Sequence, residues 1–241
     1  MKFDAVSNVG KVRNNNEDSY YISDEENFPL FIVADGIGGH NFGEIASKMA
    51  VDVIKKSIKS IDHYENLDEL ESDMIKAISN ANNEVYNMSN SADEYAGMGT
   101  TLTALYVYYD SILIGHVGDS RTYAINSREI RQLTEDDTIV NRLLKLGEIT
   151  QSEAQNHPKK NIITNAIGTD SSIDISLIQY NYGKGEYILM CTDGLTDMAT
   201  NEEILNIINE HKIPSKISAK LLEIALEAGG KDNITLIIIQ V

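Results

Sequence analysis

Several apolar segments of this chain have the length of a β-strand and end directly at an aspartate. Residues 188–191, ILMC, are followed after one threonine by Asp193 and Gly194. Asp35 follows the segment LFIVA, and Asp119 follows ILIGHVG. A carboxylate beside a hydrophobic core loses hydration, so it must be protonated, paired or neutralised by a cation. Any fold of this chain must therefore accommodate these charges at the ends of buried strands.

Further acidic residues adjoin two other predicted strands. Glu17 and Asp18 precede the segment SYYI, and Asp232 precedes the last apolar segment, ITLIIIQV. Aspartate is common in turns, so each position alone is compatible with a local turn. If the acids converge, hard divalent cations such as Mg²⁺ or Mn²⁺ are the natural neutralising partners. Zinc is disfavoured, because the single cysteine and the five histidines show no zinc-ligand spacing.

The order of the predicted strands indicates antiparallel sheets. Tyr109-Asp110-Ser111 lies between two apolar segments and Gly183-Lys184-Gly185 between another two, so we predict a β-hairpin at each position. Because strands do not alternate one by one with helices, a doubly wound parallel sheet is not expected. Several strands are apolar throughout, which indicates that both faces of the sheets are covered. The predicted fold is therefore of the α+β class, with packed antiparallel sheets flanked by helices.

Apolar residues at helical spacing predict two long amphipathic helices. They lie at residues 43–61 and 68–88, and we expect them to form a helical hairpin. Threonine and glutamate three residues apart predict capping boxes that begin at Thr150 and at Thr200. A last helix is predicted to begin at Pro214 and to end before two consecutive glycines.

Composition limits the architecture and the partners. With 241 residues, three prolines and no low-complexity segment, the chain is expected to form one domain, residues 1–241. No apolar stretch approaches the roughly 20 residues of a membrane span, and the N-terminus lacks a signal-peptide core, so a cytoplasmic protein without membrane insertion is expected. The formal net charge of −17 disfavours nucleic acid and anionic membranes as partners.

The glycine-rich loop DGIGGH, residues 35–40, does not fit a nucleotide-binding loop. No Gly-Lys-Ser/Thr follows it, as a P-loop requires, and Asn41 stands at the third glycine position of a dinucleotide-binding motif. Its glycines are therefore interpreted as positions where the backbone approaches a ligand or a metal closely.

In their order along the chain, these motifs resemble the protein phosphatase 2C (PPM-type) family of metal-dependent serine/threonine phosphatases, in particular its bacterial members. The resemblance extends from Ser7 to the C-terminus, and six motifs in the right order and spacing make it specific. It implies two packed antiparallel sheets with helices on both outer faces, an α-β-β-α sandwich. The motifs are Gly10-Lys11-Val12-Arg13 with Asn16-Glu17-Asp18, VADGIGGH at residues 33–40, Gly97-Met98-Gly99-Thr100-Thr101, Gly118-Asp119-Ser120-Arg121, Thr192-Asp193-Gly194-Leu195 and Gly230-Lys231-Asp232-Asn233-Ile234-Thr235.

The resemblance also implies a site with two Mn²⁺ or Mg²⁺ ions at the edge of the sheets. Asp35 would bridge the two ions. Glu17 and the backbone carbonyl of Gly36 would hold one ion, and Asp193 and Asp232 would hold the other. The residues predicted to be catalytic are Arg13, Asp35, Asp193 and Asp232.

Three further roles follow from the same resemblance. Asp18 would act through metal-bound water, Asp119 would help to bind a weaker third ion, and Arg13 would bind phosphoryl oxygens with its forked guanidinium. Two ions that share a water lower its pKa, so a bridging hydroxide is expected to attack phosphorus directly. Because no covalent intermediate is needed, Cys191 is interpreted as a core thiol.

Two positions depart from the family pattern. Ile37 stands where eukaryotic members have a histidine that is a candidate general acid. Protonation of the leaving group then falls to a metal-bound water, with His40 and His157 as alternatives. Asp136-Asp137-Thr138 stands where bacterial relatives often carry Asp-His-Ser, which argues against a histidine role there. The segment at about residues 136–170 resembles the family's flap and is expected to lie beside the site and to influence substrate choice.

The predicted function is hydrolysis of phosphoserine and phosphothreonine in proteins by a monomer that opposes a bacterial serine/threonine kinase and its targets. In the flap, the charge of Lys159 and Lys160 either attracts phosphopeptides or belongs to a solvated surface. Three alternatives are hydrolysis of a small phosphomonoester, control of a sigma-factor antagonist, and a metal-free binding module without catalysis. The last is disfavoured because the chain retains all four carboxylates of the implied site, Glu17, Asp35, Asp193 and Asp232.

Overall fold

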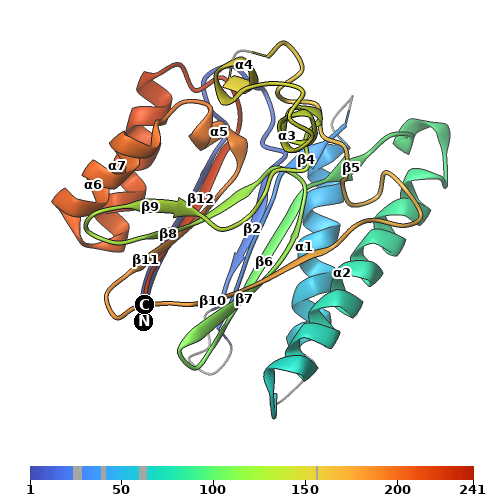
Figure 1. Ribbon diagram of the computed structural model, residues 1–241. Helices are drawn as coiled ribbons and strands as arrows, with labels where there is room; N and C mark the ends of the chain where they lie inside the picture. The colour runs from blue at the N-terminus through green and yellow to red at the C-terminus, as the bar shows by residue number, and fades with distance from the viewer. Residues whose placement is uncertain (24–28, 39–41, 60–63, 156) are drawn as a thin grey trace.

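The computed structural model describes residues 1–23, 29–38, 42–59, 64–155 and 157–241. Within these residues it contains two five-stranded antiparallel sheets (Figure 1). Sheet A has the strand order β1 (Lys2–Asn8), β12 (Ile234–Gln240), β11 (Tyr187–Cys191), β8 (Arg121–Ile125) and β9 (Ile130–Gln132). Sheet B has the order β10 (Ser176–Asn181), β7 (Ser111–Val117), β6 (Leu102–Tyr108), β3 (Leu30–Ala34) and β2 (Ser19–Ile22). The short strands β4 (Gly36–Ile37) and β5 (Gly99–Thr100) pair with each other.

Helices cover the outer face of each sheet (Figure 1). The helices α1 (Gly43–Lys59) and α2 (Leu67–Ser89) pack on sheet B, whereas α5 (Asp193–Thr196), α6 (Asn201–His211) and α7 (Pro214–Glu227) pack on sheet A. Apolar side chains of both sheets meet in a central core, among them Phe31, Ile114, Ile188 and Ile237. The two sheets with helices outside confirm the predicted α+β class and the α-β-β-α arrangement.

The helix predictions agree with the structure in the described residues. The helices α1 and α2 lie side by side, and their apolar stripes bury Ile54, Met74 and Ile78 against sheet B. Thr200 forms the predicted capping box with Glu203 at the start of α6. At the start of α4 (Gln151–Gln155), the Thr150 backbone N–H donates to the Glu153 carboxylate and the Glu153 backbone N–H donates to the Thr150 hydroxyl, as predicted for a capping box. The helix α7 has Pro214 in its first turn, as predicted.

One of the two predicted hairpins is wrong. Tyr109 and Asp110 do form the two-residue turn between β6 and β7. By contrast, residues 182–186 connect β10 at the edge of sheet B with β11 in the middle of sheet A. The strand β10 alternates in exposure, as an edge strand does, whereas every residue of β11 is buried and needs neighbouring strands on both sides. The burial of β11 therefore outweighs the local turn signal at Gly183-Lys184-Gly185.

Three shorter helices complete the described structure. They are η1 (Asp93–Tyr95), α3 (Ile139–Lys145) and α4, and the last two lie in the segment at about residues 136–170 that the sequence predicts to be a flap, hereafter the flap. In Figure 1 α3, α4 and α5 lie at the same end of the molecule, above the sheets. In the described parts of the chain, every helix is too short or too polar to span a bilayer.

Candidate metal centre

The pairing of the strands brings the acidic residues that were predicted to bind metal to one edge of the two sheets. In sheet B, Ser19 pairs with Ala34, so Asp18 and Asp35 lie at the same end of β2 and β3. In sheet A, Cys191 pairs with Leu236, so the end of β11 lies beside the start of β12. The register of β-strands therefore assembles acids that are up to about two hundred residues apart in the chain.

The carboxyl groups are close enough to raise one another's pKa. Burial raises the pKa of Asp35 well above its usual value, and the charges of Asp18, Asp193, Asp119 and Asp232 raise it further. Burial and the neighbouring charge of Asp193 raise the pKa of both Asp18 and Asp119 to about 7. Burial and the neighbouring charge of Asp232 raise the pKa of Asp193 to about 6. The cluster therefore holds negative charge that only protons or cations can neutralise.

Asp18 has one satisfied and one unsatisfied carboxyl oxygen. Its Oδ2 accepts a hydrogen bond from the buried Thr192 hydroxyl at 3.0 Å. In the described part of the chain its Oδ1 is buried and has no hydrogen-bond partner. A buried carboxylate oxygen without a donor is costly, and a cation or its hydration water would satisfy it. This atom fits a nearby metal ion.

Glu17 and Gly36 present oxygens to the same space at the start of α1. A side-chain carbon added at Gly43 would overlap Glu17 Oε2 and would lie 2.9 Å from the Gly36 carbonyl oxygen. The two oxygens that the resemblance assigns to one ion therefore both border one space, the cradle over Gly43, which only glycine leaves open. The buried Ser47 hydroxyl donates to the Glu17 carbonyl oxygen at 2.6 Å and fixes this backbone.

The donor set suits Mg²⁺ or Mn²⁺, since it consists of carboxylate and carbonyl oxygens. Within the described residues, however, no three acidic, histidine or cysteine side chains already form a ligand set around a common point. Asp232, one of the predicted ligands, is paired with Arg13.

Arg13 is the residue predicted to bind the substrate phosphate. Its Nη2 donates to Asp232 Oδ2 at 2.8 Å, and the two side chains are 55% and 37% exposed. Exposed ion pairs contribute about 0–1 kcal/mol, so this guanidinium is free to exchange Asp232 for a phosphoryl group. The structure thus places Arg13 at the rim of the acidic cluster.

Asn233 holds the loop on which Arg13 and Glu17 lie. Its side chain is buried, and its oxygen accepts from the backbone N–H of Glu17 at 2.8 Å. Its amide nitrogen donates to the carbonyls of Val9 and Asn15 at 3.0 and 2.9 Å. Sequence reasoning recognised Asn233 as part of a motif but not this role, because its partners lie more than two hundred residues away.

Asp119 is buried, and the flap fixes the turn that precedes it. Gly118 has a φ of +107°, and its backbone N–H donates to Asp137 Oδ2 at 3.0 Å. The same oxygen accepts from Asn165 Nδ2 on the returning arm of the flap at 2.7 Å. Asp136 instead binds Arg121. The two aspartates that replace the expected Asp-His pair therefore tie the flap to the site.

The histidines considered as proton donors have different positions. His40 lies outside the described residues. His157 lies on the flap, where its Nδ1 accepts from the backbone N–H of Lys159 at 3.2 Å. Ile37 pairs with Gly99 in the short β4–β5 sheet. Cys191 is buried, and burial raises its pKa to about 12, so it is a neutral thiol, as expected for a core position.

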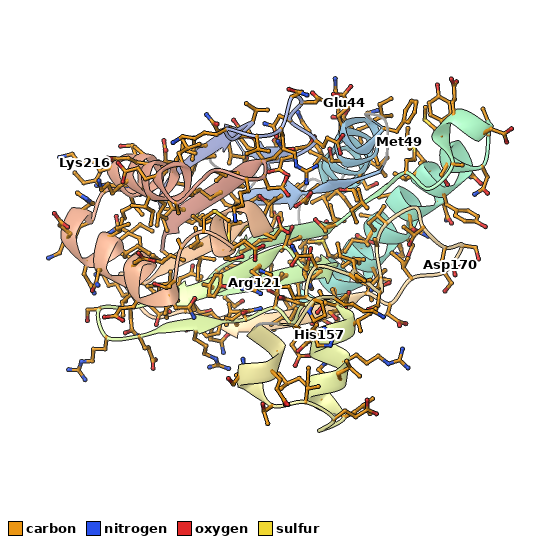
Figure 2. The ribbon with its side chains drawn as sticks, turned by 90° about the horizontal axis from the view of Figure 1, so that it is seen from above. Glu44, Met49, Arg121, His157, Asp170 and Lys216 are labelled. Carbon is orange, nitrogen blue, oxygen red and sulfur yellow. The ribbon has the colours of Figure 1, made fainter. Side chains whose placement is uncertain are left out.

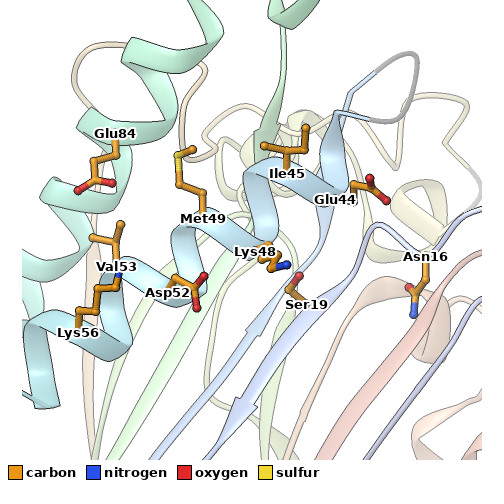
Figure 3. A pocket seen from close by; sticks show the side chains of 10 residues that line it. All are labelled: Asn16, Ser19, Glu44, Ile45, Lys48, Met49, Asp52, Val53, Lys56 and Glu84. Atoms are coloured by element: carbon orange, nitrogen blue, oxygen red, sulfur yellow. The ribbon is translucent and has the colours of Figure 1, made fainter.

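Two cavities flank this end of the molecule, onto which Figure 2 looks down. One, of about 570 Å³, includes Asp119 and Asp193 in its lining and extends under the flap. The other, of about 590 Å³, lies over the exposed face of α1, and its lining includes Asn16 and Glu44 (Figure 3). Of the predicted metal ligands, Asp119 and Asp193 line the first cavity and none lines the second.

The comparisons with known proteins agree with the fold and with the family that the motifs resemble. The family model for protein phosphatase 2C matches residues 11–219. The serine/threonine phosphatase stp of Listeria monocytogenes is 35% identical over 232 residues, which cover 96% of this chain and 92% of that protein. The serine/threonine phosphatase of S. agalactiae has a TM-score of 0.93 and 35% identity, over 98% of each chain. The catalytic domain of the phosphatase PstP, solved with two manganese ions, has a TM-score of 0.84 and 32% identity, over 98% of this chain and 96% of that one.

Proposed function

The chain belongs to the protein phosphatase 2C family, and we propose that its acidic cluster binds two Mn²⁺ or Mg²⁺ ions for the hydrolysis of phosphoserine and phosphothreonine. Membership makes it a serine/threonine protein phosphatase. The observation that supports the metal site best is the group of buried carboxylates that raise one another's pKa around Asp35. Such a group needs cations to remain ionised at neutral pH.

The proposed ligands divide into two sets that share Asp35. Glu17 and the Gly36 carbonyl flank the cradle over Gly43 and would hold one ion. Asp193 and Asp232 lie at the adjoining ends of β11 and β12 and would hold the other. These residues fit the hard-oxygen preference of Mn²⁺ and Mg²⁺.

Asp18 and Asp119 would complete the surroundings of the ions. The unsatisfied Oδ1 of Asp18 would accept from a water of hydration, because the Thr192 hydroxyl already occupies its other oxygen. Asp119, which lines the cavity under the flap, is the candidate ligand of a third and weaker ion.

The protein's own groups would position the phosphate. Bound divalent ions would supply an activated water and neutralise the charge of the phosphoryl group. Arg13 would leave Asp232 and bind two phosphoryl oxygens in a forked contact, for which its guanidinium is suited. Asn233 would keep the loop of Arg13 in register with Glu17. Hydrolysis by direct attack of water on phosphorus would need no covalent intermediate, in keeping with the buried Cys191.

The proposed biological role is to reverse the action of a serine/threonine kinase on its protein targets. The relatives' names support this role, since stp of L. monocytogenes is described as a serine/threonine phosphatase. A monomer remains the predicted state of the active protein.

The test is phosphate release from a phosphothreonine peptide with and without Mn²⁺. We expect turnover with Mn²⁺, none in EDTA, and loss of at least about a hundredfold in kcat for Asp193→Asn. Calorimetric titration with Mn²⁺ should show fewer or weaker sites in that variant. Undiminished turnover in EDTA, or normal Mn²⁺ binding by the Asp193 variant, would contradict the metal assignment.

A further inference from the structure

His116 is a buried histidine that the proposed mechanism does not use. It lies in β7 with none of its surface exposed, between its strand neighbours Thr103 in β6 and Ser176 in β10. Its Nδ1 lies 2.9 Å from the Thr103 hydroxyl, and its Nε2 lies 3.1 Å from the backbone carbonyl oxygen of Glu135. The ring therefore bridges sheet B and the segment that leads into the flap.

The two partners determine which ring nitrogen carries the hydrogen. A carbonyl oxygen can only accept, so Nε2 must donate to Glu135. Burial lowers the pKa of His116, which keeps the ring neutral at neutral pH. In a neutral imidazole with hydrogen on Nε2, Nδ1 is an acceptor, so the Thr103 hydroxyl donates to it. His116 is therefore an uncharged link from Thr103 to the carbonyl of Glu135.

A second contact lies two residues further along both segments. The backbone N–H of Asp137 donates to the Gly118 carbonyl oxygen at 2.8 Å, and the Gly118 N–H donates to Asp137 Oδ2 at 3.0 Å. Residues 116 and 118 therefore hold residues 135 and 137, so the end of β7 fixes the base of the flap, residues 135–137, at two points.

Gly118 is the residue through which these contacts reach the site. Its φ of +107° favours glycine, and a side-chain carbon added there would lie 2.7 Å from the Thr101 side chain, so this turn has little room to adjust. Asp119 follows it directly, is buried, and lines the cavity under the flap. A shift of the flap base would therefore move the carboxylate that is proposed to bind the third ion.

A histidine that only filled space in sheet B would not need a partner outside the sheet. An apolar side chain of similar size would fill this space without the cost of burying two polar nitrogens. That cost is offset only when both nitrogens are hydrogen-bonded, and one of the two bonds of His116 leaves the sheet for Glu135. The ring contacts therefore indicate a role at the flap base.

We propose that His116 is a positioning residue, which holds the flap base against β7 through the Nε2–H of its neutral ring and thereby holds Asp119 for the third ion. The proposal rests on the proposed function for the role of Asp119. The link between His116 and the flap base is tested separately, in the metal-free protein.

Two amide variants test this link, because each donates from the position of one ring nitrogen. His116→Gln places an N–H where Nε2 lies and can reach the Glu135 carbonyl, whereas His116→Asn places it where Nδ1 lies and is too short. Ser111→Ala is the matched control. Ser111 is also buried in β7 and donates to the Tyr108 carbonyl at 2.9 Å, at the other end of the strand.

NMR of the metal-free protein reports on the ring and on the flap base. The ring nitrogens of the wild type should show hydrogen on Nε2 alone, a measurement that needs no variant. Exchange of the Gly118 and Asp137 amide hydrogens is measured relative to Ile114 in the middle of β7, so that global unfolding cancels. It should be at least about tenfold faster in His116→Asn, within about threefold of wild type in His116→Gln, and unchanged in Ser111→Ala. Hydrogen on Nδ1, or equal exchange in all three variants, would overturn the proposal.

Calorimetric titration with Mn²⁺ extends the test to Asp119. We expect the Kd of the weakest Mn²⁺ site to rise about tenfold in His116→Asn and much less in His116→Gln, with the tighter sites unchanged. Wild-type Mn²⁺ binding by His116→Asn, despite faster amide exchange, would show that the link does not position Asp119 and would overturn the proposal. A wild-type protein that binds no Mn²⁺ would instead overturn the proposed function, and the role of Asp119 with it.

Discussion

The side-chain oxygen of Asn233 accepts a hydrogen bond from the backbone N–H of Glu17 at 2.8 Å. The amide nitrogen of the same side chain donates to two carbonyls of the loop that precedes Glu17. The side chain next to Asp232 therefore fixes the position of Glu17 relative to Asp232. The two residues that precede β12 thus have different roles. Asp232 would bind metal, and Asn233 fixes the loop that carries Glu17.

Replacement of Asn233 by alanine should weaken metal binding as well as folding. It leaves three buried or half-buried backbone groups without a partner, at about 1–3 kcal/mol each when water cannot reach them. We expect a lower midpoint of thermal unfolding in EDTA and a Kd for Mn²⁺ raised about tenfold, measured by calorimetry. Asn209→Ala is the control, because Asn209 makes an exposed bond to the Ser127 carbonyl. Unchanged Mn²⁺ affinity in Asn233→Ala would show that the loop keeps its position without this side chain.

Replacement of Arg13 by alanine should act on substrate binding and barely on stability. Its pair with Asp232 is exposed, so the free energy of unfolding should change by less than about 1 kcal/mol. We expect KM for a phosphothreonine peptide to rise at least about tenfold with a smaller loss of kcat, and Arg13→Lys to recover part of the loss. A kcat loss with unchanged KM would assign Arg13 to the chemical step instead.

Much of the site was predictable because its residues stand at the ends of apolar strands. An acid one or two residues beyond a strand that is buried to its last residue lies at the edge of the sheet, as Asp35, Asp119 and Asp193 do. The antiparallel register then brings Asp232 to the same edge. Local sequence contains both the apolar segment and the acid, so the pattern is visible without any knowledge of the fold.

The parts that could not be predicted depend on contacts between distant segments. The turn signal at residues 183–185 is real, but the choice between pairing β11 with β10 or with β12 and β8 depends on burial in the whole sheet. Similarly, Gly43 and Asp137 act through neighbours in space, Glu17 and Gly118, that no short motif includes. Spacing along the chain identifies such residues only after the sheets are assembled.

In EDTA the stability of the protein should fall as the pH rises. The pKa is raised to about 7 for Asp18 and Asp119 and to about 6 for Asp193, against about 4 for aspartate in an unfolded chain. Between about pH 4 and pH 7 the folded chain therefore binds more protons than the unfolded chain, so its stability decreases with increasing pH. We expect the unfolding midpoint in EDTA to be several degrees lower at pH 8 than at pH 5.

Two additions to this experiment connect the pH effect with the metal site. Mn²⁺ at pH 8 should restore the midpoint, because cations replace the missing protons. Asp35→Asn removes a carboxylate whose pKa is raised by four acidic neighbours, so the unfolding midpoint of this variant in EDTA should depend less on pH. A midpoint that is flat or rises between pH 5 and pH 8 in EDTA would show that the carboxyl groups are not close enough to repel one another.

Replacement of Gly43 by alanine should separate helix stability from metal binding. Alanine favours a helix over glycine by about 1 kcal/mol, so the start of α1 would gain if nothing else touched it. The added carbon would, however, overlap Glu17 Oε2 and lie 2.8 Å from the carbonyl carbon of Gly36. Because that neighbour is backbone, the cradle of the first ion must widen or Glu17 must turn away.

We therefore expect Gly43→Ala to raise the Mn²⁺ concentration needed for half-maximal activity, and the Kd of one calorimetric site, about tenfold or more. Gly183→Ala is the control, because a carbon added there would meet only the Glu186 side chain at an ordinary 3.5 Å. That variant should keep both Mn²⁺ constants. If Gly43→Ala binds two Mn²⁺ ions with wild-type affinity, the oxygens of Glu17 and Gly36 do not hold a common ion, and the proposed ligands of the first ion are wrong.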